Sequence, residues 1–362
     1  MTSGQGIKTS TRGLAAILLA AGKSTRMKSD LPKVMHEICG RPMLAYVIDA
    51  CREAGVKDFY IVVGFGKEAV MSAFSQEPGV RFVEQTEQKG TGHAVQMCRD
   101  AFKDFAGDVI VIAGDMPLIH AKTLTDLVGG HRAAAAAASI ATTVLGDPTG
   151  YGRIVRNAGG EFESIVEHRD ATPEQLAIRE VNPSYYCFDA VALFEAIERI
   201  TPNNAKGEYY ITDALSVLRA DGRKVLANTR VPAEDATGIN SRSELAQVAH
   251  LMRLRICAAW MENRVTIVDP DNTWIDSRAV IGPETVVRPF TYIEGNARIG
   301  AGCVVGPFAY VTAGAVVADG ATVGPGALTA FDATAGSRPT PHPAGKRTVQ
   351  VVRRPPAQSG CP

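Results

Sequence analysis

The sequence has no excess of either charge and no long hydrophobic run. Lysine plus arginine total 38, as do aspartate plus glutamate, so no overall field draws the chain onto nucleic acid or an anionic membrane. No apolar run approaches the ~18 residues that a membrane-spanning helix requires. We therefore expect a cytoplasmic protein with no nucleic-acid or membrane partner, in which any anionic ligand is bound locally.

A cysteine framework is also missing. The seven cysteines are odd in number and scattered, and none forms a Cys-x-x-Cys pair, so neither a disulfide scaffold nor a zinc site is indicated. Residues 14–21 resemble the apolar part of a signal peptide, but they continue directly into a Gly-Lys-Ser loop and further periodic sequence. We interpret this segment as a buried first strand and its loop, which again favours the cytoplasm.

Short apolar runs alternate with helical patterns from residue 14 to about residue 132. Four runs fit strands buried on both faces, because they are short and bounded by glycine or charge: 17–19, 59–63, 80–83 and 109–113. Residues 42–55 and 91–102 have the pattern of amphipathic helices. The alternation predicts an α/β fold with a mainly parallel sheet, completed by a looser insertion that ends near residue 242.

A six-residue repeat dominates the sequence after residue 264. Aliphatic residues recur at every sixth position from Ile275 to Val323, and a small residue follows each by four positions, from Ala279 to Ala327. This period predicts a hexapeptide β-helix, in which each flat side takes one inward aliphatic residue. We predict five segments: a disordered leader (1–12), an α/β domain (13–242), a linker helix (243–264), a short left-handed β-helix (265–330) and a disordered basic, proline-rich tail (331–362).

The loop after the first predicted strand is a candidate phosphate-binding loop, since backbone N–H groups at the carboxyl end of a parallel strand can surround phosphates. A dinucleotide fingerprint needs three spaced glycines, and only Gly22 is present. A Walker loop fails as well, because its first glycine would fall on Ile17, inside the strand. The continuation through residues 29–33 favours a third kind of nucleoside triphosphate loop.

Seven motifs between residues 19 and 213 occur together, and as a set they are specific. They are residues 19–27, 30–34, 84–94, 114–118, 149–154, 166–171 and 203–213. With them the chain resembles the sugar-phosphate nucleotidyltransferases, and most closely the bacterial bifunctional N-acetylglucosamine-1-phosphate uridylyltransferases. The resemblance implies a Rossmann-like domain with a mixed, mainly parallel sheet. It also implies that UTP and N-acetylglucosamine 1-phosphate form pyrophosphate and UDP-N-acetylglucosamine, a cell-wall precursor.

The same resemblance implies a nucleotide site and two cationic catalytic residues. The nucleotide would be held by Leu19, Ala20, Ala21, Gly22, Gln85, Gly90 and Thr91. An amide side chain such as Gln85 suits the imide edge of uracil, which offers one N–H and two C=O groups. Arg26 and Lys33 would reduce the repulsion between two anionic substrates that approach in line.

The resemblance also implies a metal site formed by Asp115, which follows a predicted strand, and Asn240. Hard oxygen ligands with retained waters suit Mg²⁺, which would stabilise the leaving pyrophosphate. A sugar phosphate with a second pKa of about 6 is largely dianionic at pH 7, so no general base is required. His93 and His168 are accordingly interpreted as structural or surface residues, and Tyr209-Tyr210 as packing around a turn.

The resemblance places the amino sugar against Gly152, Glu167 and Asn182, since a carboxylate and an amide suit hydroxyl and acetamido groups. The chain departs from its relatives directly afterwards. It has Pro183-Ser184 where they usually have a hydroxyl residue and glycine, so this loop loses an N–H donor and backbone freedom.

Two alternatives stay open. One is a uridylyl- or thymidylyltransferase for glucose 1-phosphate or a related sugar, because pocket details separate these enzymes more than motifs do. The other is a non-catalytic regulatory subunit, against which the joint presence of Lys33, Asp115 and Asn240 argues.

The β-helix is expected to be structural and suited to three-fold packing in a homotrimer. Full-length relatives use a longer β-helix for acetyl transfer, and His342 is the only histidine beyond the repeat. We therefore expect acetyltransferase activity to be absent.

Overall fold

The computed structural model describes residues 12–229 and 231–329 and divides the chain into two compact units. The first contains the residues up to His36 and those from Pro42 to Glu244, and the second contains Glu37–Arg41 and the residues from Leu245 onward. Most of the predicted leader and the predicted tail, with His342, lie outside the described residues. Arg12 is described, and its guanidinium pairs with Asp108 (Nε to Oδ1, 2.9 Å).

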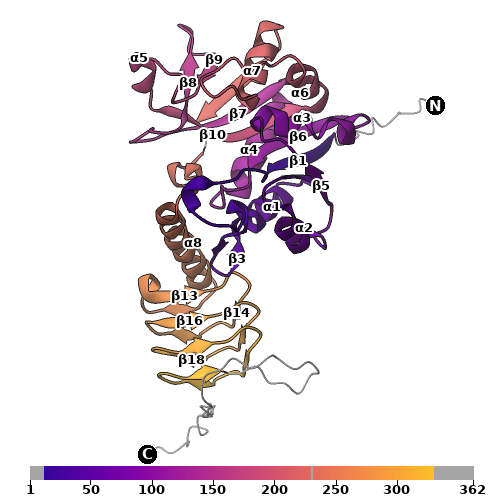
Figure 1. Cartoon of the computed structure of the whole chain (residues 1–362). Helices are drawn as coiled ribbons and strands as arrows, with labels where there is room; N and C mark the ends of the chain where they lie inside the picture. The colour runs from indigo at the N-terminus through magenta and orange to yellow at the C-terminus, as the bar shows by residue number, and fades with distance from the viewer. Residues whose placement is uncertain (1–11, 230, 330–362) are drawn as a thin grey trace, which may run out of the picture. The chain divides into compact units, whose positions relative to one another are not determined.

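A nine-stranded mixed sheet forms the centre of the first unit (Figure 1). The order is β11-β7-β10-β6-β1-β4-β5, and β8 and β9 extend it from β10. β1 pairs in parallel with β4 and β6, whereas β10 is antiparallel to β6 and β7. The strands are β1 Gly13–Leu19, β4 Asp58–Val63, β5 Val80–Glu84, β6 Gly107–Ala113, β7 Ala138–Val144, β8 Gly152–Arg156, β9 Phe162–Val166, β10 Glu180–Asp189 and β11 Val225–Thr229. The predicted mixed α/β sheet is confirmed.

Helices cover both faces of this sheet. Consecutive residues of its central strands point to opposite faces, and they are buried on both. The apolar cluster on one face joins the strands to α3, α6 and α7. On the other side α1 packs against α4, and α4 contacts β7 and β10. The helices are α1 Met43–Glu53, α2 Lys67–Phe74, α3 Thr91–Gln96, α4 Ala121–Ala133, α5 Pro173–Leu176, α6 Ala190–Ile197 and α7 Ile211–Ala220.

The predicted helix over residues 91–102 is wrong in its length. α3 ends at Gln96, and a short 3₁₀ turn, Arg99–Phe102, follows it. Val95, Cys98 and Phe102 are buried in one apolar cluster, so the segment keeps one inward face throughout. A tighter turn preserves this face while the hydrogen bonds change to i→i+3, and the hydrophobic pattern therefore could not show the break.

The second unit is a short β-helix preceded by α8, Arg242–Glu262 (Figure 1). Three parallel sheets form its sides, and residues 18 positions apart pair within them, as Val286 does with Val304. The predicted inward aliphatic residues, from Ile275 to Val323, are all buried. The hexapeptide β-helix is confirmed. Its strands are β12 Thr266–Ile267, β13 Thr273–Ile275, β14 Val280–Ile281, β15 Val286–Val287, β16 Thr291–Ile293, β17 Arg298–Ile299, β18 Val304–Val305, β19 Tyr310–Val311, β20 Val316–Val317, β21 Thr322–Val323 and β22 Leu328–Thr329.

Residues 37–41, most of an early hairpin, also belong to the second unit, and no sequence pattern predicted this. β2 Glu37–Ile38 and β3 Arg41–Pro42 enclose a two-residue turn. Cys39 (φ 46°) and Gly40 (φ 80°) both lie in the left-handed region, as a tight hairpin turn requires. The backbone of Ser277 donates to the Cys39 carbonyl (3.3 Å), which joins this turn to the β-helix.

Candidate functional site

The loop after β1 is held open by backbone contacts. Phe65 N–H and the Gln88 side-chain amide both donate to the Ala21 carbonyl, at 3.1 and 2.8 Å. A Cβ added to Gly22 would meet no protein atom within 4 Å. The protein fold therefore does not require glycine there, and its small size leaves space in the adjoining pocket. Gln88, which sequence reasoning missed, fixes the loop through its side chain.

The first pocket of the site has a volume of about 350 Å³ and contains every residue predicted to bind the nucleotide, together with Lys33 and Asp115. Gln85 is 5% exposed, and its side-chain nitrogen donates to the Gly90 carbonyl (3.1 Å) and lies 3.0 Å from His93 Nδ1. Both amide hydrogens are thereby engaged, so Gln85 Oε1 is the atom left to meet a ligand. His93, interpreted above as structural, orients Gln85.

The turn at Gly90 and Thr91 is tied to the segment that precedes α7. Gly90 has φ 109°, and a Cβ there would lie 2.5 Å from the Tyr209 carbonyl oxygen, so only glycine fits. Tyr209 N–H donates to the Lys89 carbonyl (2.8 Å), and its own carbonyl accepts from Gly92 N–H (2.7 Å). The Thr91 hydroxyl accepts from Ile211 N–H (3.1 Å). The side chain of Thr91 therefore caps α7, while the residue lines the pocket.

Lys33, Asp115 and Asn240 meet at one point, although they are far apart in sequence. Lys33 begins a 3₁₀ turn, Asp115 follows β6, and Asn240 precedes α8. The Lys33 ammonium pairs with Asp115 Oδ2 and donates to Asn240 Oδ1 (3.3 Å). A carboxylate and an amide oxygen thus converge on one cation. This donor set fits a hard divalent ion, whose other ligands would be phosphate oxygens and water. Over residues 12–229 and 231–329, no larger group of metal-ligating side chains exists.

Asn240 is fixed by the cap at the start of α8, which sequence reasoning missed. Glu244 Oε2 accepts from the backbone N–H groups of Asn240 (2.5 Å) and Ser241 (3.0 Å). The Ser241 hydroxyl in turn accepts from Glu244 N–H (3.3 Å). This is a capping box, and the Ser-x-x-Glu spacing at residues 241–244 could have revealed it. Ile239 N–H also donates to the Asp115 carbonyl (3.3 Å), which links the two predicted metal ligands.

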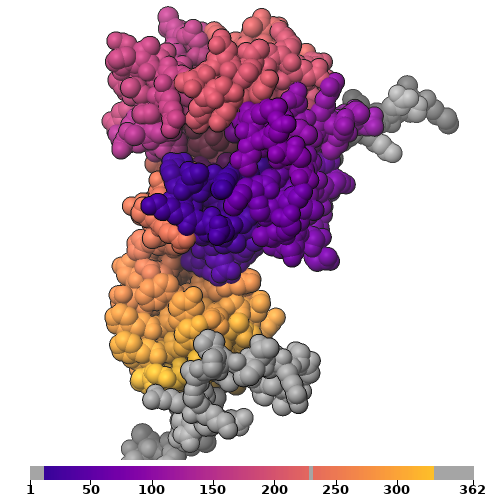
Figure 2. All heavy atoms as spheres, viewed as in Figure 1, coloured from indigo at the N-terminus to yellow at the C-terminus, as the bar shows by residue number. Residues whose placement is uncertain are grey.

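The second pocket, of about 340 Å³, contains Arg26, Asp115 and Asn240 with the three residues predicted to hold the sugar. Gly152 pairs with Asn182 across β8 and β10. A Cβ on Gly152 would lie 3.3 Å from Glu167 Oε1, so glycine keeps the space before this carboxyl free. Asp115 lines both pockets, and every predicted site residue lines one or the other. Figure 2 shows the hollowed face of this unit, between the indigo N-terminal surface and the pink surface of later residues.

Asn182 stabilises the unusual loop that follows it. Its side-chain nitrogen donates to the Tyr186 hydroxyl (2.7 Å), and its oxygen accepts from Ser184 N–H (2.9 Å). The pairing of β10 with β7 shifts register between Val181 and Tyr185, and Ser184 has φ 68°. Pro183 needs no N–H partner within such a bulge, whereas Ser184 occupies a conformation that glycine adopts more easily.

The carboxyl of Glu167, in the second pocket, has a shifted pKa. Burial raises the pKa of its carboxyl; Lys206 opposes this rise, and Asp170 and Asp213 add to it.

Arg26 also lines a neighbouring cavity of about 480 Å³ with His168, Arg169 and Lys206. His168, interpreted above as structural or surface, lies 3.3 Å from the guanidinium of the buried Arg153 (Nη2 to Nδ1).

Comparisons with known families and proteins agree with this geometry. Residues 16–214 match the MobA-like NTP transferase domain, and residues 278–313 and 296–331 match the bacterial transferase hexapeptide. The chain is 45% identical over 278 residues to the bifunctional protein GlmU of Pelotomaculum thermopropionicum, an alignment that covers 77% of this chain and 60% of the relative. It is also 45% identical over 276 residues to the bifunctional protein GlmU of Geobacillus thermodenitrificans, covering 76% and 60%. The chain thus spans 60% of the length of these curated relatives.

A solved structure of a UDP-glucose pyrophosphorylase complexed with UDP-glucose is similar in fold. Its TM-score is 0.55 at 20% identity, and the match covers 67% of this chain and 99% of that one. In the described part of the chain, no helix is long and apolar enough to cross a membrane.

Proposed function

The chain belongs to the MobA-like NTP transferase family, and on this premise we propose that it joins UTP to N-acetylglucosamine 1-phosphate and releases pyrophosphate. The observation that carries the proposal is the pair of adjoining pockets that share Asp115. One has a polar base-recognition element and the other a carboxyl and an amide suited to a sugar. Two substrates bound there would bring their phosphates to the shared residue. The match to an NTP transferase domain supports the same reaction class.

Gln85 favours uracil through its side-chain oxygen, Oε1. Its amide hydrogens are engaged by Gly90 and His93, so Oε1 can only accept a hydrogen bond. Uracil has an N3–H donor at its imide edge, whereas N3 of cytosine is an acceptor. Cytosine would place two acceptors against each other in a buried setting, which costs about 1–3 kcal/mol for the unpaired groups.

Phosphate charge is balanced by Lys33 and Arg26, which line the first and second pockets respectively. The dianionic sugar phosphate is itself the nucleophile, so the task of these residues is to position and neutralise two anions for in-line attack. Asp115 and Asn240 would hold Mg²⁺, which supplies Lewis-acid stabilisation of phosphate oxygens when bound. Lys33 would then exchange its contacts with these residues for phosphate oxygens.

The acceptor sugar is bound by Gly152, Glu167 and Asn182. The raised pKa of Glu167 increases the fraction of its carboxyl that is protonated and able to donate to a sugar oxygen. Gly152 leaves the space beside that carboxyl free, and a larger residue would fill it. Asn182 retains one amide hydrogen and one oxygen lone pair for the acetamido group or a hydroxyl.

The proposal is tested by pyrophosphate release from UTP, Mg²⁺ and a panel of sugar 1-phosphates. We expect N-acetylglucosamine 1-phosphate to give the highest kcat/KM, and CTP to be a poor substitute for UTP. A higher kcat/KM for glucose 1-phosphate, or for TTP over UTP, would overturn the choice of substrate while sparing the reaction class. No release with any acceptor would favour the non-catalytic alternative.

For the second unit we propose assembly into a homotrimer through the β-helix. Support comes from the side formed by β14, β17 and β20, where Val280 and Val316 are 48% and 72% exposed. Multi-angle light scattering of the purified protein should give three times the chain mass, and Val316→Asp should reduce it. A monomer at micromolar concentration would refute this assembly.

The absence of acetyl transfer stays a prediction, to be tested with glucosamine 1-phosphate and acetyl-coenzyme A by thiol release.

A further inference from the structure

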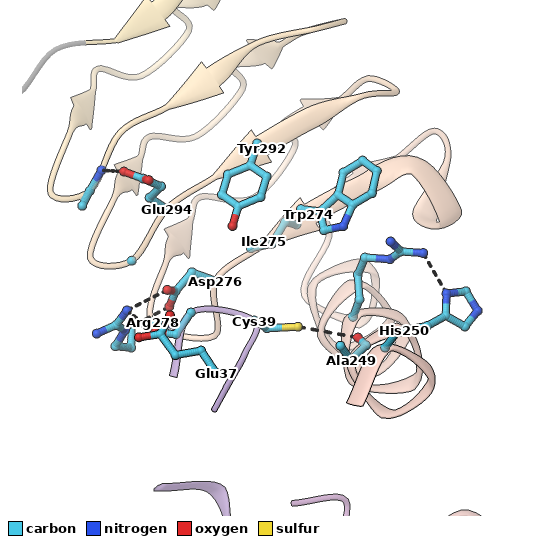
Figure 3. Close-up of a pocket in the computed structure, with 15 residues that line it drawn as sticks. Glu37, Cys39, Ala249, His250, Trp274, Ile275, Asp276, Arg278, Tyr292 and Glu294 are labelled. Atoms are coloured by element: carbon cyan, nitrogen blue, oxygen red, sulfur yellow. Dashed lines mark hydrogen bonds and ion pairs between the residues drawn. The ribbon is translucent and has the colours of Figure 1, made fainter. Parts of the chain in front are cut away.

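The second unit contains a cavity of about 640 Å³ that the proposed reaction does not use (Figure 3). Three segments that are distant in sequence form its walls: the hairpin turn at residues 37–40, the part of α8 from Ala246 to Arg253, and one side of the β-helix including Trp274 and Tyr292. In Figure 3 the Tyr292 hydroxyl points into this cavity, toward Asp276 and Cys39. The whole lining belongs to the second unit.

One wall is fixed by an ion pair whose carboxylate is buried. Asp276 is 7% exposed, and the Arg278 guanidinium donates to both of its oxygens, at 3.0 and 2.7 Å. Arg278 also donates to the Gly40 carbonyl (2.7 Å). A Cβ at Gly40 would lie 1.6 Å from Asp276 Oδ2, so the hairpin reaches this position only because residue 40 is glycine. The wall is therefore pre-formed, as ligand pockets usually are.

The opposite wall carries a guanidinium without a counter-charge. Arg253 lies over the Trp274 ring (4.9 Å to the centroid), and its Nη2 is 2.8 Å from His250 Nδ1. Its Nε is buried without a hydrogen-bond partner, and no carboxylate pairs with Arg253 among the described residues. His250 in turn lies 3.9 Å from Asp271. A partly buried, unpaired guanidinium favours an anionic ligand, preferably one with a planar or tetrahedral set of oxygens.

Between these walls lies an aromatic floor. Trp274 and Tyr292 pair across β13 and β16, and the two residues are 39% and 41% exposed. Aromatic residues with nearby carboxyl groups suit a hydroxylated ring, whose C–H face packs on the aromatic rings while its hydroxyls donate to oxygens. Glu37 and Glu294 supply such oxygens, although Glu294 already accepts from Ala313 N–H (2.7 Å) and the Tyr310 hydroxyl.

Charge limits the ligand further. Arg278 is paired with Asp276, so Arg253 is the one cation of the lining left to meet an anionic group, and Glu37 and Glu294 disfavour any further negative charge. A nucleoside di- or triphosphate would bring more negative charge than these groups can balance. A single phosphate matches the one unpaired guanidinium.

We propose that this cavity binds a monophosphorylated sugar. Its phosphate pairs with Arg253 and hydrogen-bonds to His250, its ring packs on Trp274 and Tyr292, and its hydroxyls donate to Glu37 and Glu294. The site is separate from the pockets of the proposed transferase reaction, and its occupation does not depend on that reaction.

Tryptophan fluorescence of the full-length protein tests the proposal, because the chain has only two tryptophans, Trp260 and Trp274. Glucose 6-phosphate, whose anomeric hydroxyl is free, should change the emission saturably. Glucose and inorganic phosphate should each bind at least ten-fold more weakly, since each makes only part of the contacts. Arg253→Met should weaken glucose 6-phosphate binding by about ten-fold or more, the scale of a lost charge-assisted hydrogen bond.

Three comparisons make the test decisive. Arg288→Met removes an exposed guanidinium of the same β-helix outside the cavity and should bind like the wild type. Lys33→Ala should also retain binding, which distinguishes the cavity from the transferase pockets. Tyr292→Ala, measured by calorimetry, provides a second cavity variant should Arg253→Met fold poorly. Unsaturable emission, wild-type affinity in both cavity variants, equal affinity for phosphate alone, or tighter binding of UMP would each overturn the proposal.

Discussion

In the β-helix the inward residues follow one another at every sixth position, whereas the α/β unit assembles its site from residues spread between Leu19 and Asn240. Each hexapeptide of the β-helix buries one aliphatic side chain and pairs with the hexapeptide 18 residues earlier. In the α/β unit, loops at strand and helix ends present side chains to a shared space. The comparison teaches that substitutions in the β-helix core should reduce stability, while those in the pockets should reduce turnover and leave the fold intact.

The largest effect should come from Asp115→Asn. Loss of this charge removes a proposed metal ligand and the partner of Lys33, and kcat should fall by about 10²–10³-fold, the cost of losing one electrostatic stabiliser. Steady-state pyrophosphate release at saturating Mg²⁺ measures it. Asp126→Asn, which affects only an exposed i,i+4 pair with Lys122, should leave kcat unchanged. Equal turnover of both variants would remove Asp115 from the site.

Glu167→Gln should change stability in a pH-dependent way, and its effect on sugar-phosphate binding is seen separately in KM. The folded pKa of Glu167 lies above its ordinary value of 4.5, so the charged carboxyl is unfavourable in the folded state. Stability from this group is full below pH 4.5 and is lost as the pH rises through the raised folded pKa. The variant should therefore melt at a higher temperature than the wild type at pH 8 but not at pH 4. KM for the sugar phosphate should rise about ten-fold.

For this variant, thermal melts across pH and initial rates with varied sugar phosphate are the measurements. A melting temperature that falls equally at both pH values would contradict the assigned effect of burial on Glu167.

A core substitution in the β-helix should reduce stability and leave turnover unchanged. Ile293 is fully buried, and Ile293→Val removes one methylene, which costs about 0.5–1.5 kcal/mol of unfolding free energy. Urea unfolding followed by tryptophan emission reports on this unit, because Trp260 and Trp274 both lie in it, and kcat/KM should stay at the wild-type value. A fall in turnover in proportion to the loss of stability would contradict the separation of stability and turnover between the two units. Val268→Ala, on the exposed surface of the same unit and outside the proposed trimer contact, is the matched control.

The smallest effect is expected for Gly22→Ala. The added Cβ meets no protein atom, so stability should be unchanged or rise by up to about 0.4–1 kcal/mol through the unfolded state. The methyl group enters the first pocket, however, and KM for UTP should increase several-fold while KM for the sugar phosphate stays constant. Reduced stability with unchanged KM would show that Gly22 serves the backbone rather than the ligand.

Several features of the site followed from the sequence because neighbouring residues carried the signal. The strand from Val109 to Ala113 placed Asp115 at its carboxyl end, and the glycine-poor loop after β1 excluded dinucleotide and Walker geometries. Other features depended on distant partners. The hydrogen bond between Gln85 and His93, the tie between Tyr209 and the turn at Gly90, and the cap that fixes Asn240 are visible only once the chain has folded.

The resemblance of the motifs named the residues that line the two pockets, whereas the sequence by itself determined the alternation of strands and helices and the hexapeptide period. These are properties of local backbone geometry and of side-chain burial at regular spacing, so they can be inferred from a few adjacent residues. Tertiary structure decided where α3 ends, that the turn at Cys39 and Gly40 joins the β-helix unit, and that Arg253 lacks a counter-charge. These depend on contacts between residues far apart in the chain, whose meeting no local period encodes.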